Sequence, residues 1–189
     1  MKILVVGGIG YIGSHMLKRF KETNYDIEIL DNLSSGQKEN TLNYKLHVCD
    51  LSDKETVYKI LSEQNYDLVM HFAASINVEE SYNNPKKYQQ NNVINTINLL
   101  DCMKDLKINK FIFSSSAAVY GEPEHLPVTE LHPFNPVNPY GDTKAEVEKI
   151  LKSYEESCGL KYVSLRYFNA CGAHPDGTIG EMHDPETHL

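Results

Sequence analysis

The chain has 189 residues, of which 41% are hydrophobic and 23% charged, and its formal net charge at pH 7 is −8. Such a composition is typical of a soluble globular domain that is large enough to build one hydrophobic core. The acidic balance argues against nucleic-acid binding, and no apolar run is long enough for a membrane span or a signal peptide. The four cysteines form no Cys-x-x-Cys pair, which argues against a disulfide framework or a metal site. We therefore expect a cytoplasmic protein.

The first element is expected to be a buried strand that leads directly into a glycine-rich turn. Residues 2–6 are mostly Ile, Leu and Val, as in a strand covered on both faces of a parallel sheet. The turn contains Gly7, Gly8, Gly10 and Gly13, which satisfy the spacing Gly-x-Gly-x-x-Gly. Glycine is needed where the backbone turns tightly and touches a pyrophosphate, and the following helix directs free N–H groups at the same phosphates. The pattern predicts a dinucleotide site.

A second strand is expected over residues 26–30, and Asp31 follows it. In dinucleotide-binding domains, an acidic residue ~20 positions beyond the glycine turn binds the hydroxyls of the adenosine ribose. An acid at this place repels a 2′-phosphate, so the sequence favours NAD over NADP. The alternative is that Asp31 only shapes a turn, which the order of strand, glycine turn, helix and strand makes the weaker interpretation.

The rest of the chain also alternates between strands and helices, which predicts an α/β fold with a Rossmann-type doubly wound parallel sheet. Helix starts are indicated by a capping box from Ser52 to Glu55 and by Asn-Pro pairs at Asn84 and Asn138. Gly159 is expected to end the last of these helices. Further strands are expected at residues 45–48, 67–74, 110–113 and 162–168.

A Tyr-x-x-x-Lys pair lies in the first turns of the helix that starts after Asn138. Residues four apart share one face of a helix, so Tyr140 and Lys144 are expected to point into the same space. A nearby cation lowers the pKa of a phenol, which makes Tyr140 a general base usable near neutral pH. Ser116 is expected to hold the substrate oxygen. Such a set suits proton removal from an alcohol during hydride transfer, although Tyr-x-x-x-Lys alone also occurs on ordinary surface helices.

The candidate residues converge on one edge of the expected sheet. Gly7, Asp31, Asp50, Ala73 and Asn169 each lie just past the carboxyl end of an expected strand, and so do the serines that end in Ser116. Ligands of open α/β sheets bind at this edge. These motifs are independent of one another in the sequence, so their convergence supports a single site.

Several motifs occur together: GGIGYIGSH at 7–15, FIFSSSAAVYG at 111–121, PYGDTK at 139–144 and RYFN at 166–169. Together they resemble the extended short-chain dehydrogenase/reductase superfamily. Within this superfamily, the chain is similar to the N-terminal part of the UDP-glucose 4-epimerase family, one of the NAD-dependent epimerases and dehydratases. The resemblance extends over essentially the whole chain.

The resemblance implies a role for each matching residue. NAD would be bound by Gly7, Gly10, Tyr11, Ile12, Gly13, Asp31, Asn32, Ser35, Gly36, Asp50, Leu51, Phe72, Ala73, Ala74, Asn92, Tyr140, Lys144 and Phe168. The sugar nucleotide would be bound by Ser116, Tyr140 and Asn169. The catalytic residues would be Ser116, Tyr140 and Lys144, and no metal is implied.

The activity implied is NAD-dependent 4-epimerisation of a UDP-hexose, UDP-glucose or UDP-galactose, through a transient 4-keto sugar. This reaction belongs to galactose and nucleotide-sugar metabolism. Related dehydratases carry an acidic residue just before a Val-Tyr-Gly, whereas this chain has Ala117 and Ala118 there. The alternatives are a non-catalytic NAD-binding remnant, another sugar-nucleotide enzyme of the superfamily, and a simple dehydrogenase that releases reduced cofactor.

Two residues depart from the family pattern and are expected to weaken NAD binding. Ile76 replaces a lysine that often reaches the cofactor phosphates, and Ile9 adds bulk where the glycine turn usually has Ala or Ser.

Length is a further departure, because a C-terminal sugar-binding domain is expected and is missing. Residues 1–189 are then the NAD-binding domain, with residues 175–189 as a tail toward the substrate domain. We expect little epimerase activity from this chain alone. The family also implies a homodimer through the helices that begin near Asn84 and Asn138.

Overall fold

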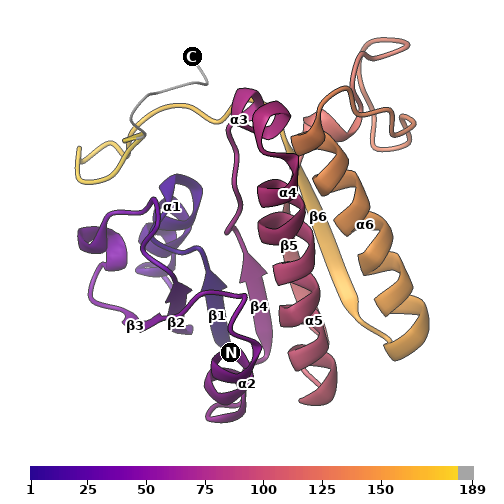
Figure 1. Ribbon diagram of the computed structural model, residues 1–189. Helices are drawn as coiled ribbons and strands as arrows, with labels where there is room; N and C mark the ends of the chain where they lie inside the picture. Colours follow the sequence, from indigo (N-terminus) through magenta and orange to yellow (C-terminus); the bar gives the residue numbers. More distant parts are fainter. Residues whose placement is uncertain (183–189) are drawn as a thin grey trace.

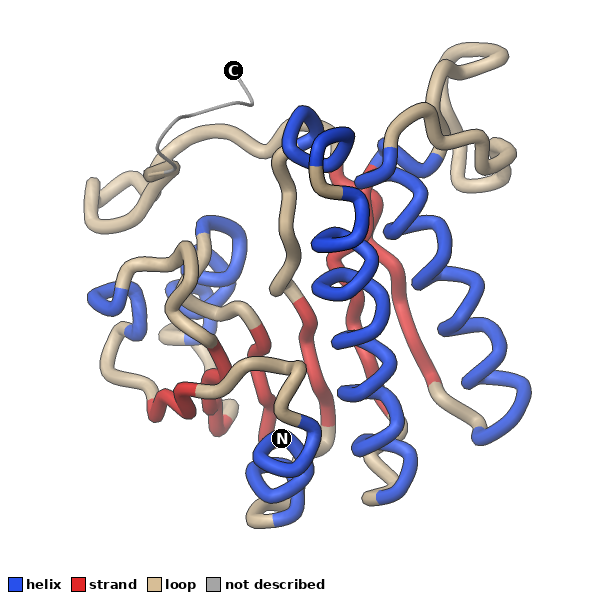
Figure 2. Tube along the Cα trace, in the orientation of Figure 1, coloured by secondary structure: helices blue, strands red, loops and turns tan. Residues whose placement is uncertain are grey.

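The computed structural model describes residues 1–182 and shows a single parallel sheet with helices packed on both of its faces (Figures 1 and 2). The expected tail over residues 175–189 lies in part outside the described residues. The six strands are β1 (Lys2–Val6), β2 (Asp26–Asp31), β3 (Lys45–Val48), β4 (Leu68–His71), β5 (Lys110–Ser116) and β6 (Lys161–Tyr167). The main helices are α1 (Tyr11–Phe20), α2 (Lys54–Ser62), α3 (Val78–Asn83), α4 (Pro85–Tyr88), α5 (Asn95–Asp105) and α6 (Pro139–Cys158).

The strands lie in the order β3-β2-β1-β4-β5-β6, and every neighbouring pair is parallel. This order confirms the Rossmann-type doubly wound sheet. From β1 the chain adds β2 and β3 on one side of the sheet, and from β4 it adds β5 and β6 on the other side. The neighbours β1 and β4 end together, where Val6 pairs with His71. Ligands of open sheets bind at such a switch point, outside the carboxyl ends of the strands. The topology therefore places the glycine turn after β1 beside the loop after β4.

Two layers of apolar side chains hold the helices to the sheet. On one face, α2, α5 and α6 pack on alternate residues of the strands, for example Val57, Leu99 and Val147 against Leu4 and Phe111. The opposite face carries α1. Its core contains Ile3, Val5, Ile9, Leu17, Phe20, Ile27, Ile29 and Met70. Strands buried on both faces need the nearly continuous apolar runs that the sequence shows.

Two strands have different ends from those expected. The strand expected at residues 67–74 stops at His71, and the small residues beyond it form a loop. The strand expected at residues 110–113 continues to Ser116, because Ser114, Ser115 and Ser116 pair with β6 in the same register. The serines therefore belong to the strand itself, which gives the Ser116 side chain a fixed position at the edge of the sheet.

One of the expected helix caps is wrong, and a second lacks only its side-chain hydrogen bond. The capping box at Ser52 does not form, since Asp53 is the N-cap of α2 and its carboxylate accepts from the Thr56 N–H at 3.1 Å. Asn84 is the N-cap residue of α4 and its proline neighbour begins the helix, as expected, but the Asn84 side chain makes no cap hydrogen bond. A short helix that was not expected, α3, precedes α4, and the side chain of Asn77 caps α3. From α4 the helical path continues through a π-helical segment, η2 (Gln89–Ile94), into α5.

Helix α6 follows its sequence signals at both ends. The Asn138 side chain accepts a hydrogen bond of 2.7 Å from the Gly141 N–H, and a proline begins the helix. Gly159 ends the helix with a φ of 72°, a left-handed conformation that glycine adopts without steric cost. Figure 1 shows α6 beside the path of α4 and α5. The first turns of α6 therefore stand over the carboxyl end of β5.

Candidate cofactor and active site

A cleft of about 1050 Å³ runs along the carboxyl ends of the strands. Its walls come from the glycine turn, the loops after β2, β3 and β4, the end of β5, the start of α6 and the segment after β6. The expected site residues that line it are Gly7, Gly10, Tyr11, Ile12, Gly13, Asp31, Asn32, Ser35, Asp50, Leu51, Phe72, Ala73, Ala74, Ser116, Tyr140, Lys144, Phe168 and Asn169. The convergence expected from the sequence is thus present in the structure.

The glycine turn is packed so closely that side chains are excluded. Gly7 has a φ of +73°, and a Cβ added there would lie 2.4 Å from the backbone nitrogen of Ala73. A Cβ on Gly13 would lie 2.4 Å from the Gly7 carbonyl oxygen. Gly10 differs, because an added Cβ would have only the Gly7 oxygen nearby, at 3.6 Å. Gly7 and Gly13 are thus closely packed, whereas Gly10, just before α1, faces open space. This arrangement fits the approach of a phosphate group to a helix N-terminus.

Asp31 holds the glycine turn and faces the cleft. Its carboxylate accepts from the Ile9 N–H at 3.3 Å and from the Leu33 N–H at 3.0 Å. Burial raises the pKa of Asp31, and these backbone donors act against that rise. A carboxylate at the end of β2 fits ribose hydroxyls.

A second polar pair continues the same wall, since the Asn32 amide donates to Asp50 at 2.6 Å. A hydrogen bond from Ser52 holds the pKa of the Asp50 carboxyl below its ordinary value. The pair therefore offers a charged carboxylate beside Asp31 on the wall that fits an adenosine.

Two residues that the resemblance placed at the cofactor lie behind the walls. Gly36 packs against Ile9, since a Cβ on it would lie 2.4 Å from the Ile9 side chain. Asn92 is 3% exposed, and it accepts from the Ser75 N–H at 2.8 Å and donates to the Ser75 carbonyl at 2.9 Å. Asn92 therefore fixes the loop after β4. Its neighbour Asn91 lines the cleft instead. The sequence does not distinguish the two positions, because both residues are asparagine.

The two isoleucines that depart from the family pattern have different surroundings. Ile9 is fully buried in the core under α1, so its bulk is directed into the core, contrary to the expectation that it crowds the pyrophosphate. Its carbonyl accepts from the Asn40 amide at 3.1 Å. Ile76 lines the cleft, in agreement with its expected place.

Ser116 and Tyr140 meet at the middle of the cleft. The Ser116 hydroxyl accepts from the Ala118 N–H at 3.1 Å and hydrogen-bonds the Tyr140 phenol. Burial raises the Tyr140 pKa, and the hydrogen bond from Ser116 partly lowers it. The expected lowering of this pKa by Lys144 is not found.

Lys144 explains why the expectation fails. Its side chain is 3% exposed, and its Nζ donates to the Ser114 carbonyl oxygen at 2.8 Å and lies 5.8 Å from the centre of the Tyr140 ring. Burial lowers the pKa of Lys144 to about 7. An ammonium that is partly neutral at pH 7 and directed at a carbonyl gives a phenolate little support.

An ion pair behind Lys144, between Glu148 and Arg166, has no counterpart among the expected site residues. Glu148 lies one helical turn beyond Lys144, and its carboxylate accepts from Ser115 Oγ at 2.5 Å and from Arg166 Nη2 at 2.7 Å. Arg166 also donates to the Tyr120 hydroxyl at 2.7 Å. These contacts join α6 to β5 and β6. The spacing of Lys144 and Glu148 on one face of α6 is a signal that could have placed Glu148 near the site, but it does not identify Arg166 as the partner.

Among residues 1–182, no group of three or more His, Cys, Asp or Glu side chains is arranged to hold a metal ion. Likewise, no helix in this part of the chain is both long and apolar enough to cross a lipid bilayer.

The sheet order and the glycine turn define a dinucleotide-binding Rossmann domain. The family model described as the NAD dependent epimerase/dehydratase family matches residues 3–184. A UDP-glucose 4-epimerase of Lactobacillus helveticus is 48% identical over the whole of this chain. The chain therefore belongs to the NAD-dependent epimerase/dehydratase family.

Solved structures agree with this assignment. The UDP-glucose 4-epimerase of Brucella ovis, in complex with NAD, is 45% identical with a TM-score of 0.97 over 100% of this chain. The UDP-Glc/GlcNAc 4-epimerase of Campylobacter jejuni is 44% identical with a TM-score of 0.88 over 96% of this chain. This chain spans 58% of the length of the Lactobacillus protein and 58% of the Brucella chain.

Proposed function

We propose that this chain is the NAD-binding part of an enzyme that epimerises a UDP-hexose at C4. The observation that carries the proposal is the presence of Ser116, Tyr140 and Lys144 in the same cleft as the glycine turn. Bound NAD supplies an acceptor and donor of hydride. The similar Brucella protein contains NAD, which supports the choice of cofactor.

In this proposal the residues of the chain position the sugar and move one proton. Tyr140 removes the proton from the sugar 4-hydroxyl, and Ser116, which already hydrogen-bonds the phenol, holds the same oxygen. The proton returns from Tyr140 after the 4-keto sugar has turned over in the site. Lys144 holds the end of β5 through the Ser114 carbonyl and, by resemblance, binds the nicotinamide ribose. Asn169 binds the nucleotide sugar.

The wall beside Ser116 favours epimerisation over dehydration. Ala117 and Ala118 line the cleft directly after it, and neither side chain can transfer a proton. Elimination of water needs a further acid or base, whereas epimerisation at C4 reuses the same proton. We therefore infer a 4-epimerase rather than a dehydratase.

Assembly and location complete the proposal. We propose a homodimer formed through α4, α5 and α6, which lie side by side in Figure 1, and a cytoplasmic location for the protein. Analytical ultracentrifugation tests the first, with a monomer at micromolar concentration as the contrary result. Cell fractionation tests the second.

The first test of the function measures cofactor. The purified chain is denatured, and the released NAD and NADH are quantified per chain. We expect close to one dinucleotide per chain, and a folded protein without dinucleotide contradicts the proposal. UDP-galactose is then added to detect turnover; release of free NADH during turnover would indicate a simple dehydrogenase instead.

Tyr140→Phe tests the base. It is expected to abolish any hydride transfer from the UDP-hexose that the chain supports and to leave cofactor content unchanged, because only the phenol oxygen is lost. Tyr154→Phe is the matched control, since Tyr154 lies toward the other end of α6 and its hydroxyl bonds Asp101, away from the cleft. Loss of NAD from Tyr140→Phe would show that the assigned role is wrong.

A further inference from the structure

The cleft carries more negative than positive side chains. Within residues 1–182, its ionisable acids and bases apart from tyrosine and cysteine are Asp31, Asp50, Glu80, Glu181, Lys87 and Lys144. A dinucleotide adds the two negative charges of its diphosphate. The N–H groups at the start of α1 offset part of this charge, and a cation within reach would offset more.

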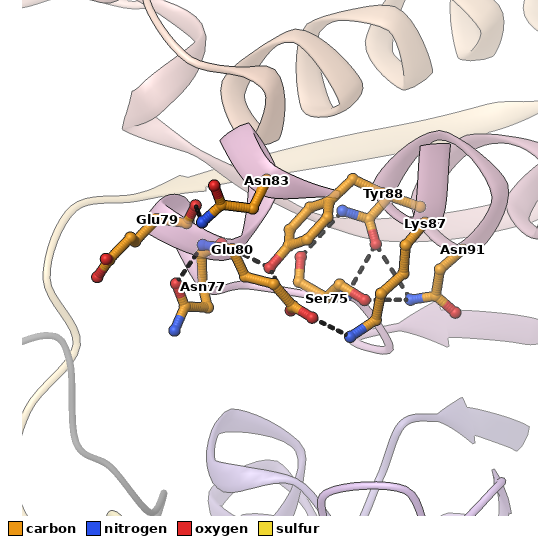
Figure 3. A network of polar contacts seen from close by, with 9 residues as sticks. Ser75, Asn77, Glu79, Glu80, Asn83, Lys87, Tyr88 and Asn91 are labelled. Atoms are coloured by element: carbon orange, nitrogen blue, oxygen red, sulfur yellow. Dashed lines mark hydrogen bonds and ion pairs between the residues drawn. The ribbon is translucent and has the colours of Figure 1, made fainter. Parts of the chain in front are cut away.

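Lys144 is not available for this purpose. Its Nζ is buried and donates to the Ser114 carbonyl, and its place is at the Tyr140 end of the cleft. Lys87 differs in each respect. Its side chain is 55% exposed, and its Nζ pairs with Glu80 at 2.5 Å (Figure 3). Ion pairs with this exposure hold weakly, so the ammonium can exchange partners at little cost.

Lys87 lines the cleft from the short helix α4. Asn91 follows it by one helical turn on the same face, and the Asn91 amide donates to Ser75 Oγ at 3.1 Å. Ser75 is two residues from Ala73, whose backbone nitrogen would lie 2.4 Å from a Cβ on Gly7. This series of contacts connects the helical segment that carries Lys87 and Asn91, through the loop after β4, with the turn that receives the diphosphate in the proposed function.

We propose that Lys87 is a cofactor-binding residue, which leaves Glu80 and pairs with the diphosphate of NAD when the dinucleotide enters the cleft. The inference rests on the proposed function, since it takes NAD as the ligand. Lys87 then supplies the positive charge that Ile76, which also lines the cleft, does not.

Glu80 does not lose all its partners when Lys87 leaves. The hydroxyl of the buried Tyr88 lies 3.0 Å from the Glu80 carboxylate and 2.5 Å from the Asn77 carbonyl (Figure 3). Asn77 in turn caps α3, because its side chain accepts from the Glu80 N–H at 2.8 Å. The contacts among Asn77, Glu80 and Tyr88 thus hold this part of the cleft without the Lys87 ammonium. Glu80 keeps Lys87 close to the cofactor site through an ion pair that can be exchanged.

The test compares Lys87→Gln with Lys86→Gln in the 189-residue chain. Lys86 is the matched control, because it is an exposed lysine on the same short helix and does not line the cleft. After any copurified dinucleotide has been removed, binding of NAD, ADP-ribose and adenosine is measured by calorimetry at two salt concentrations, and folding is checked by circular dichroism.

For Lys87→Gln we expect NAD and ADP-ribose to bind about tenfold more weakly, as for the loss of one charge-assisted hydrogen bond, and adenosine to bind unchanged. The affinity of the wild type for NAD should also fall more steeply with salt than that of the variant.

Three results would overturn the inference. If the wild type binds NAD and both variants bind it equally well, Lys87 does not contact the diphosphate, while the proposed function stands. If Lys87→Gln weakens adenosine as much as NAD, the effect is structural. If the folded wild type binds no NAD, the proposed function fails and the inference fails with it.

Discussion

The Lys144 ammonium donates a hydrogen bond of 2.8 Å to the carbonyl oxygen of Ser114 and lies 5.8 Å from the centre of the Tyr140 ring. This places a cation against the last residues of β5, in a site where Lys144 is 3% exposed. Burial of an ammonium disfavours its charged form, and the pKa of Lys144 accordingly falls to about 7. The geometry that positions the active site therefore reduces the stability of the fold.

Lys144→Met is expected to stabilise the protein at neutral pH. The folded-state pKa of about 7 lies below the ordinary value of 10.5, so the folded chain binds fewer protons than the unfolded chain between these two values. Stability then rises with pH across this window, and the full cost of Lys144 is present below pH 7. The gain in free energy of unfolding should be on the order of 2 kcal/mol after allowance for the lost hydrogen bond to Ser114.

Urea unfolding from pH 6 to pH 10 measures this gain. The difference between the variant and the wild type should shrink as the pH approaches 10.5. Lys152→Met, an exposed change on the same helix, should give a difference near zero throughout. A gain for Lys144→Met that does not vary with pH would show that packing, rather than charge, is its cause.

His71 is expected to make the protein sensitive to acid. It is 2% exposed, its Nε2 lies 2.9 Å from Thr96 Oγ1, and its Nδ1 has no hydrogen-bond partner. Burial, with a smaller effect of Lys144, lowers the pKa of His71 to about 3 from an ordinary value of 6.5. A lowered folded-state pKa means that the stability is complete above pH 6.5 and is lost as the pH falls from there toward 3.

His71→Gln should remove most of this pH dependence, because glutamine keeps a hydrogen bond to Thr96 and does not titrate. Thermal unfolding between pH 4 and pH 7 is the measurement, with the exposed His125→Gln as the control. If His71→Gln loses stability on acidification as steeply as the wild type does, other groups carry the acid sensitivity.

The parts of the fold that the sequence predicts best are those in which local signals and burial agree. The apolar run after Met1, the glycine turn and the cap at Asn138 each need one local conformation, and each has it in the structure. Where a local signal is not supported by burial, the prediction from it can be wrong, as at the start of α2. Ser52 and Asp53 both suit an N-cap, and the choice depends on Asp50, whose carboxylate already accepts from the Ser52 N–H at 2.8 Å.

The same limit applies to the candidate site. Which residues lie at the sheet edge follows from strand order, and this was predictable. The direction in which the Lys144 ammonium points was not, because it depends on the Ser114 carbonyl, which is positioned by long-range pairing of β5 with β6. Asn91 and Asn92 have identical side chains, and only the helical phase through η2 decides which one faces the cleft.

Glu148→Gln is expected to destabilise the protein by about 3 kcal/mol, since removal of one partner from a buried ion pair leaves the other uncompensated. The Glu148 side chain is 7% exposed and that of Arg166 20%, so solvent can replace the lost contact only in part. Chemical denaturation is the measurement, and Glu156→Gln, exposed on the same helix, is the control.

The double variant Glu148→Gln with Arg166→Met should recover part of the loss, because it removes the unpaired charge as well. A double variant that is as unstable as the sum of the two single variants would show that the two side chains act independently.

Gly7→Ala and Gly159→Ala distinguish two reasons why a position needs glycine, namely a positive φ and a lack of space for a side chain. Both residues have positive φ, +73° for Gly7 and +72° for Gly159, so alanine brings similar backbone strain at each, about 1 kcal/mol. They differ in space: a Cβ on Gly7 would lie 2.4 Å from the Ala73 nitrogen, whereas a Cβ on Gly159 would have nothing within 4 Å. We expect Gly7→Ala to cost roughly 3 kcal/mol, at the upper end of what overpacking costs.

Urea unfolding and the NAD content after purification are measured for both variants. Gly7→Ala can relieve its clash only if the glycine turn and the loop after β4 move apart, and both of these line the cleft. It should therefore lose bound NAD, while Gly159→Ala keeps it. Equal losses of stability in the two variants would mean that backbone strain alone determines the need for glycine, and that the contact between Gly7 and Ala73 does not hold the two walls of the cleft together.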